Sequence, residues 1–197
     1  MKLILIAGMP ASGKSTVAQK LSRRFGIPVL EKDAIKEELF DTLGFSDYSQ
    51  KRALDVAATA VLLRMADSLL AGGTSFILVN NFRADAADEV KGLLNKYDVR
   101  CVTVFFRGDG DVFYKRYAKR DQNKARHMGH ALQTHYPPRE GDPTTYTMTR
   151  KEFAEKFEDL GMDRFDAGTP RIEIDATYPE TIDLDALAAE IEEKTAQ

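Results

Sequence analysis

Five short apolar runs are spread along the chain, and amphipathic stretches separate them. They are Lys2–Ala7, Pro28–Leu30, Ser75–Asn80, Val99–Phe106 and Arg171–Asp175. Short, continuous apolar runs of this kind are typical of strands that are buried on both faces. Because helical patterns alternate with them, we expect an α/β fold with a parallel sheet covered by helices on both sides.

The stretches between these runs carry the spacing of helices. We expect one helix from Lys14 to Arg24, ending near Gly26, and a shorter one over Ala34–Phe40. A long helix is expected over Ser49–Ala71, where apolar residues recur at helical spacing: Leu54, Ala58, Val61, Leu62, Met65 and Leu69. Later helices are marked by Val90–Tyr97, by a capping box at Thr149 and Glu152, and by Leu184–Ile191 with Asp183 as its cap.

The segment Gly8–Thr16 directly follows the first apolar run and reads Gly-Met-Pro-Ala-Ser-Gly-Lys-Ser-Thr. The two glycines allow the backbone to curl so that its N–H groups converge on phosphate oxygens at the start of a helix. Lys14 can reach the β- and γ-phosphates, and the Ser15 hydroxyl can ligate Mg²⁺. A glycine-rich turn that merely contains a lysine is the alternative. We predict that ATP and Mg²⁺ bind here, with contacts from Gly8, Met9, Pro10, Ala11, Ser12, Gly13, Lys14, Ser15 and Thr16.

Composition narrows the possible functions. The chain has 197 residues and a net charge of −3, which suits one domain over residues 1–197 and argues against general binding to nucleic acids or membrane surfaces. No apolar stretch approaches the roughly 20 residues of a membrane span, and the first apolar run is too short for a signal peptide, so we expect a cytoplasmic protein. The one cysteine, Cys101, excludes an internal disulfide and is expected to be a buried strand residue rather than a nucleophile.

Two polar clusters follow apolar runs, at the edge of a parallel sheet where ligands bind. Asp33 can orient and deprotonate an acceptor hydroxyl, and Lys36, one helical turn later, can hold an anionic substrate group. The alternatives are that Asp33 only caps a helix and that Lys36 is a solvated lysine. Asn81 and Arg83 are candidate substrate contacts, and Asn80 and Asn81 can instead form a cap or turn.

A basic segment opens the one long irregular region, and we expect residues from about 115 to 148 to form a lid. Arg116, Arg120 and Arg126 are candidates for stabilising the transferring phosphoryl group, although a solvated surface helix would show the same charge run. His127 and His130 are three apart. We expect them to hydrogen-bond within the lid or with substrate rather than to form a metal pair, because no third ligand is evident.

Together these features resemble the small AAA-family ATPases with a kinase-like fold. That group overlaps the kinase domain of polynucleotide kinases and the gluconate-, shikimate- and chloramphenicol-type phosphotransferases. The resemblance rests on Gly8–Thr16, Asp33 with Lys36, the Arg116–Arg120 helix, Arg126–His130, and Ile174–Thr177. It implies strand order 2-3-1-4-5, Asp33 as general base, and an ATP base held between the lid helix and the loop 176–180, where Arg120 and Thr177 are the candidate contacts.

The chain departs from the family pattern in three places. It has Lys36 where relatives often have arginine, no acidic residue at Val79–Asn81, and Met128 where relatives usually have proline. The stretch Tyr136–Tyr146 is peculiar to this chain and is a candidate contact for the acceptor.

The sequence predicts an ATP-dependent phosphotransferase acting on a hydroxyl of a small polar metabolite, in a monomer or homodimer. The alternatives are a 5′-hydroxyl polynucleotide kinase and a non-catalytic ATP-binding switch.

Overall fold

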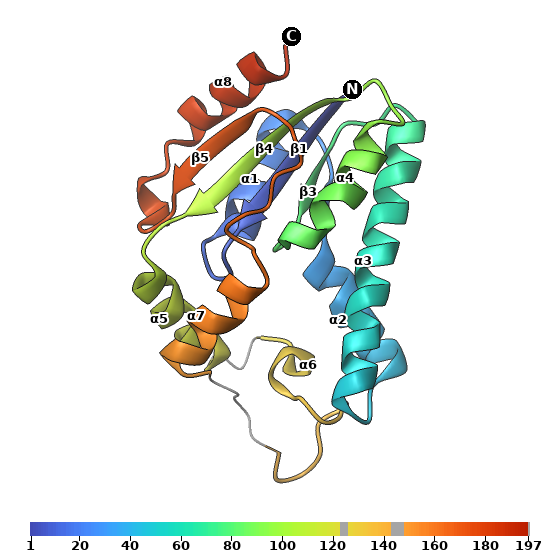
Figure 1. Ribbon diagram of the computed structural model, residues 1–197, viewed down its shortest axis with the longest axis vertical. Helices are drawn as coiled ribbons and strands as arrows, with labels where there is room; N and C mark the ends of the chain where they lie inside the picture. The colour runs from blue at the N-terminus through green and yellow to red at the C-terminus, as the bar shows by residue number, and fades with distance from the viewer. Residues whose placement is uncertain (123–125, 143–147, 197) are drawn as a thin grey trace.

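A five-stranded parallel sheet forms the centre of the molecule (Figure 1). The computed structural model describes residues 1–122, 126–142 and 148–196, apart from the side chain of Glu158. The strands stand in the order β2-β3-β1-β4-β5, and each pairs in parallel with its neighbours. They are β1 (Lys2–Gly8), β2 (Val29–Glu31), β3 (Phe76–Val79), β4 (Arg100–Arg107) and β5 (Arg171–Asp175). The predicted fold class and strand order are confirmed, and each strand lies within one residue of its predicted bounds.

Helices connect the strands and cover the sheet. They are α1 (Lys14–Phe25), α2 (Lys32–Leu43), α3 (Tyr48–Ala71), α4 (Ala87–Leu94), α5 (Gly110–Asp121), α6 (Met128–Ala131), α7 (Arg150–Asp159) and α8 (Leu184–Lys194), with short 3₁₀ turns η1 (Ala84–Ala86) and η2 (Pro179–Thr181). Figure 1 shows α5, α6 and α7 beyond the carboxyl ends of the strands. Within the described parts of the chain, no helix combines the length and apolarity needed to cross a membrane.

The alternation of side chains along β1 explains the three layers. Ile4 and Ile6 point into a core that includes buried residues of α1, α5, α7 and α8. Leu3 and Leu5 point to the opposite face, where α3 and α4 cover the sheet. Successive side chains of a strand face opposite ways, so a central strand must be apolar at every position when both faces are covered. The continuous apolar run at residues 2–7 is therefore a direct consequence of burial on both sides.

The predicted helix caps are present. The Asp183 carboxylate accepts hydrogen bonds from the amides of Asp185 and Ala186, both at 3.0 Å, at the start of α8. At α7, the amide of Glu152 donates to the Thr149 hydroxyl at 3.2 Å, and the Glu152 carboxylate accepts from the Thr149 amide at 2.7 Å. These contacts span two or three residues, which is why the local sequence predicts them.

The predicted long helix is confirmed as α3, one helix boundary differs from the expectation, and one buried face was not specified by the sequence pattern. Helix α2 begins at Lys32 with Glu31 as its N-cap residue, so Asp33 lies in the first turn and does not cap the helix. In α3, Val61 and Met65 are each 41% exposed, and the buried face is formed by Ala58, Leu62, Ala66 and Leu70. Apolar residues occur on both sides of this helix, so spacing alone did not show which side meets the sheet.

The predicted lid begins as a regular helix, because Arg116 and Arg120 belong to α5. Residues 123–125 and 143–147 of the predicted lid, with the end of the Tyr136–Tyr146 stretch, lie outside the described residues. Cys101 is buried in β4, as expected, and burial raises the pKa of its thiol to about 12. It is therefore a packing residue and not a nucleophile at neutral pH.

Replacing Gly8 by alanine is expected to destabilise the fold by about 3 kcal/mol or more. A Cβ at this position would lie 2.1 Å from the carbonyl oxygen of Phe106 in β4, and the φ of +120° already disfavours a side chain. Gly26→Ala is the matched control, since its φ is +66° and nothing lies within 4 Å of the added atom. It should cost about 1–2 kcal/mol. Urea unfolding measures both, and equal losses would contradict the steric explanation.

Candidate nucleotide and acceptor site

The loop between β1 and α1 is held in a tight curl by its own residues. Gly8, Ala11 and Gly13 all have positive φ angles, which is uncommon for alanine and is typical of strained functional loops. The Ser12 hydroxyl and the Lys14 amine donate to the Met9 carbonyl at 2.7 and 2.6 Å. Gly13 is the N-cap of α1 and supplies no side-chain hydrogen bond. The first amides of α1 are therefore left to a ligand, as in an anion site.

This loop borders a cavity of about 420 Å³, which we name the loop cavity. Its loop-side lining is Pro10, Ala11, Gly13, Lys14, Ser15 and Thr16, and the facing residues include Asp33, Asn80, Asn81, Arg116 and Arg120. Gly8, Met9 and Ser12 are not among the lining residues and instead shape the loop. The structure thus brings most of the predicted nucleotide contacts to one cavity.

Lys14 is buried, with 7% of its surface exposed, and its amine lies among polar atoms of the loop. Burial lowers the pKa of Lys14 to about 7, the Asp33 carboxylate opposes this shift, and Arg120 adds to it. Lys14 forms no ion pair with a described carboxylate, and a buried amine of this kind is poorly solvated when charged. An anion bound in the loop cavity would supply the missing counter-charge.

Asp33 is exposed to the cavities at the start of α2. Burial acts to raise the pKa of its carboxyl, but the positive charges of His130, Lys36, Arg120 and Lys32 outweigh this and hold the pKa below its ordinary value. Asp33 is therefore ionised at neutral pH. An ionised carboxylate in this place can accept a hydrogen bond from a hydroxyl and take its proton.

A second cavity of about 530 Å³ adjoins the first. We name it the lysine-rich cavity because, among the described residues, eight lysines and arginines line it with three aspartates. The lysines and arginines are Lys32, Lys36, Lys51, Arg52, Arg83, Arg120, Arg126 and Lys156, and the aspartates are Asp33, Asp55 and Asp159. Both cavities are lined by Pro10, Lys32, Asp33, Asn80, Asn81 and Arg120. Asp33 therefore lies where a molecule in one cavity would meet a molecule in the other.

The predicted substrate contacts of β3 and α2 reach this junction with different partners. Asn81 lines both cavities, and Arg83 lines only the lysine-rich cavity, where it forms an exposed ion pair with Asp85 at 2.7 Å. Lys36 also lines the lysine-rich cavity and is paired with Asp55 at 2.8 Å. Neither asparagine caps a helix, because Arg83 is the N-cap of η1.

The three arginines of the predicted lid occupy different environments. Arg120 lines both cavities and stacks over the Tyr117 ring, with 5.4 Å from guanidinium carbon to ring centroid. Arg116 lines the loop cavity and donates to the backbone carbonyls of Ala176, at 2.8 Å, and of Thr177. Arg126 lines the lysine-rich cavity and forms a buried ion pair with Asp121. Arg120 is the lid arginine that borders both the loop and Asp33.

Thr177 is part of the turn that follows β5. Its hydroxyl accepts a hydrogen bond from the Asp109 amide at 3.0 Å, and its own amide donates to the Asp175 carboxylate at 2.9 Å. Together with the Arg116 contacts, these bonds tie the turn to the start of α5. Thr177 itself does not line either cavity.

The two lid histidines attach α6 to α2. His127 lies 3.0 Å from the Asp41 carboxylate and His130 lies 2.8 Å from that of Glu37, one turn earlier on α2. His130 also lines the lysine-rich cavity, whereas His127 does not. Within the described residues no group of three or more His, Cys, Asp or Glu is arranged to hold a metal ion.

Sequence reasoning missed Lys51 and Asp55 of α3. Lys51 is 7% exposed, and its amine donates to the backbone carbonyls of His130, at 3.3 Å, and of Leu132. Asp55 binds Lys32 and Lys36 at 2.9 and 2.8 Å, and although burial works against it, these lysines lower the pKa of Asp55 to about 2. The helical spacing could have identified them, because positions 51 and 55 lie on the same face of α3 as its buried residues from Ala58 onward.

The sheet order, the glycine-rich loop and the polar cavity at the carboxyl ends of the strands define a P-loop nucleotide-binding protein. A family model described as an AAA domain matches residues 3–136. The chain belongs to this AAA domain family. The comparison with curated proteins found no match.

Solved structures share the whole fold. A protein from Chloroflexus aurantiacus, described as a putative kinase, is 29% identical, with a TM-score of 0.79 over 98% of this chain and 97% of its own. A gluconokinase from Sinorhizobium meliloti is 15% identical, with a TM-score of 0.54 over 99% of this chain and 91% of that one. A shikimate kinase from Bacteroides thetaiotaomicron is 14% identical, with a TM-score of 0.55 over 99% and 98%. The last two similarities concern the fold.

Proposed function

We propose that this protein is an ATP-dependent phosphotransferase that transfers the γ-phosphoryl group to a hydroxyl of a small polar metabolite. The observation that carries the proposal is the junction of the two cavities at Asp33, Asn81 and Arg120. It places a carboxylate and a cation between a phosphate-binding loop and a second polar space. The kinase descriptions of the similar structures agree with this assignment.

In the proposed mechanism the loop amides and Lys14 hold the β- and γ-phosphates. The acceptor lies in the lysine-rich cavity with its hydroxyl against Asp33. As the acceptor oxygen forms a bond to the γ-phosphorus, the bond from that phosphorus to the β–γ bridging oxygen breaks and ADP leaves. The proton of the hydroxyl passes to the Asp33 carboxylate. Asn81 is positioned to hydrogen-bond the acceptor.

The residues of the loop cavity suit Mg²⁺, a cation that prefers oxygen ligands and keeps several waters. Ser15 lines this cavity and is exposed to it, so its hydroxyl is the candidate protein ligand. When bound, the ion would neutralise charge on the phosphates. The neighbouring Asn80 and Asn81 can hydrogen-bond water but add no charge.

Arg120 is the residue that we propose stabilises the phosphoryl group during transfer. Its side chain borders both cavities and forms no ion pair with a described carboxylate. Arg126 is proposed to stabilise the same phosphoryl group from the lysine-rich cavity, where its ion pair with Asp121 sets its position. The sequence also predicts a catalytic role for Arg116. Its two bonds to the backbone of residues 176 and 177 favour a positioning role for the loop 176–180, the proposed site of the ATP base.

The two roles of Arg116 have different kinetic signatures. If Arg116 positions the turn, Arg116→Gln should raise the KM for ATP about tenfold and change kcat little, because a charge-assisted hydrogen bond is lost. If it stabilises the transition state, kcat should fall by roughly 10³. Steady-state kinetics decide between the two. Arg107→Gln is the control, since Arg107 forms an exposed pair with Glu173 at 2.9 Å and lines neither cavity.

Transfer of ³²P from γ-labelled ATP to a panel of alcohols tests the proposed function. Sugars, sugar acids, phosphorylated sugars and a 5′-hydroxyl oligonucleotide form the panel. Labelling of a small alcohol supports the proposal. Labelling of the oligonucleotide alone, with steeply salt-dependent binding, identifies a polynucleotide kinase instead. Tight binding of ATP without any labelled product identifies a nucleotide-dependent switch.

A further inference from the structure

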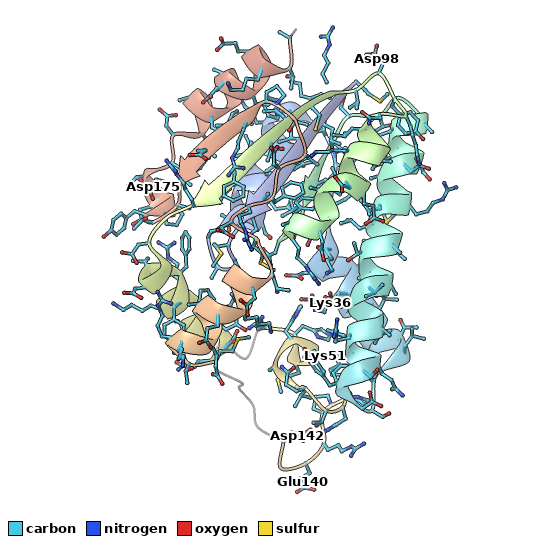
Figure 2. The ribbon with its side chains drawn as sticks, viewed as in Figure 1. Lys36, Lys51, Asp98, Glu140, Asp142 and Asp175 are labelled. Atoms are coloured by element: carbon cyan, nitrogen blue, oxygen red, sulfur yellow. The ribbon has the colours of Figure 1, made fainter. Side chains whose placement is uncertain are left out.

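The lysine-rich cavity concentrates positive charge in a chain whose net charge is −3. Among the described residues, eight lysines and arginines line it against three aspartates. Figure 2 shows Lys36 and Lys51 in the central region between α3 and the helices beyond the strands, whereas Asp98, Glu140, Asp142 and Asp175 lie at the periphery. The excess of lysines and arginines over aspartates in the lining of this cavity requires a specific explanation.

Several of these cations already have acidic partners. Lys32 and Lys36 share Asp55, Arg83 pairs with Asp85, and Arg126 pairs with Asp121. By contrast, Lys51, Arg52 and Lys156 form no ion pair with any carboxylate whose side chain the structure describes. The bonds from Lys51 to two backbone carbonyls satisfy its N–H groups but do not neutralise its charge.

The uncompensated charges act on one another. Burial, with the nearby charges of Lys36, Lys156 and Arg126, lowers the pKa of Lys51 to about 7, and Asp55 opposes this shift. Burial and Lys36 likewise lower the pKa of Lys156. Cations that come together from separate helices at such a cost are typical of a site for a highly charged anion.

Building on the proposed function, we infer that the acceptor carries a phosphate group of its own, bound by Lys51, Arg52 and Lys156 away from the hydroxyl at Asp33. A phosphate monoester carries nearly two negative charges and three acceptor oxygens, which suits three cations without carboxylate partners. A single carboxylate would leave most of that charge uncompensated. The volume of about 530 Å³ falls within the range of sites for small molecules.

The double variant Arg52→Gln/Lys156→Gln tests this inference by kinetics. Arg52 and Lys156 line the cavity but keep part of their surface in contact with solvent, and neither is in an ion pair with a described carboxylate, so the fold should be retained. Lys151→Gln is the control, since Lys151 lies on α7 with 83% of its side chain exposed and does not line the cavity. With ribose 5-phosphate or glycerol 3-phosphate, whichever is the better acceptor, the double variant should raise the acceptor KM about a hundredfold and leave the KM for ATP unchanged.

Inorganic phosphate provides a readout that does not depend on turnover. With the loop cavity saturated by Mg²⁺ and a non-hydrolysable ATP analogue, calorimetry should detect phosphate binding to the wild type and to Lys151→Gln, and a loss of at least tenfold in the double variant. If phosphate binds in this way but no phosphoryl transfer is found with any acceptor, the cavity is an anion site and the proposed phosphotransferase function is wrong.

Three results would overturn the inference: absence of phosphate binding, equal kcat/KM for ribose and ribose 5-phosphate, or a preference for gluconate that depends on the same two cations. Each leaves the phosphotransferase assignment intact if transfer to an alcohol is observed.

Discussion

Replacing Lys14 by alanine is expected to abolish turnover, with a loss of at least 10³ in kcat. Lys14 lines the loop cavity, and its amine is the proposed contact for the β- and γ-phosphates during transfer. The fold should survive, because the Met9 carbonyl keeps its hydrogen bond from the Ser12 hydroxyl. The melting temperature should be unchanged or higher, since a buried amine is removed. Lys20→Ala, at an exposed lysine of α1, is the control and should be fully active.

The titration of Lys14 gives a second measurement. In the free protein its pKa is lowered to about 7, so at pH 8 most Lys14 amines are neutral. A bound triphosphate favours the charged form and raises this pKa. Binding of Mg²⁺ and ATP at pH 8 should therefore take up a proton, up to one per site, detected by calorimetry in buffers of different ionisation enthalpy. Lys14→Met should lose this uptake. Equal uptake in both proteins would contradict the assigned contact.

Replacing Asp33 by asparagine is expected to reduce phosphoryl transfer by roughly 10²–10⁴ while leaving the affinity for ATP within a few fold. The amide keeps the shape of the side chain but cannot take the acceptor proton. Since the carboxyl pKa lies below its ordinary value, the wild type should stay active well below pH 7, until Asp33 becomes protonated. Single-turnover transfer and a separate ATP titration measure the two effects.

Glu38→Gln is the matched control for Asp33→Asn. Glu38 is an exposed carboxylate of the same helix and lines neither cavity. Transfer at the parental rate by the Asp33→Asn protein would show that Asp33 is not the general base. A parallel loss of ATP affinity would instead show that its main effect is on the charge of the loop cavity.

Local features of the chain were predictable because they depend on residues close in sequence. The loop Gly8–Thr16 follows its strand and precedes its helix, and the hydrogen bonds from its Ser12 and Lys14 side chains connect residues within five positions. The caps at Asp183 and Thr149 are equally local. The sheet order was anticipated from the family resemblance and not from periodicity, because apolar strands alone do not specify which neighbours pair.

The buried face of α3 and the first residue of α2 could not be predicted from the local sequence. In α3 the sequence offers apolar residues on two sides, and packing against β1 and β3 selects Leu62, Ala66 and Leu70. That choice brings Lys51 of the same stripe under the lid. Asp33 was recognised as a site residue, but its position in the first turn depended on α2 beginning at Lys32, a boundary that the local pattern did not show.

By itself the sequence determined the phosphate-binding loop, the strands and the candidate general base, since each depends on a short run of residues with a defined backbone preference. The tertiary structure alone decided which residues line the lysine-rich cavity, the proposed acceptor site. Lys51 lies 79 positions from His130, to whose backbone it donates, and Lys156 is on another helix again. Charges this far apart in the chain converge only after the sheet and its helices have packed, because packing, and not local preference, sets the distances between them.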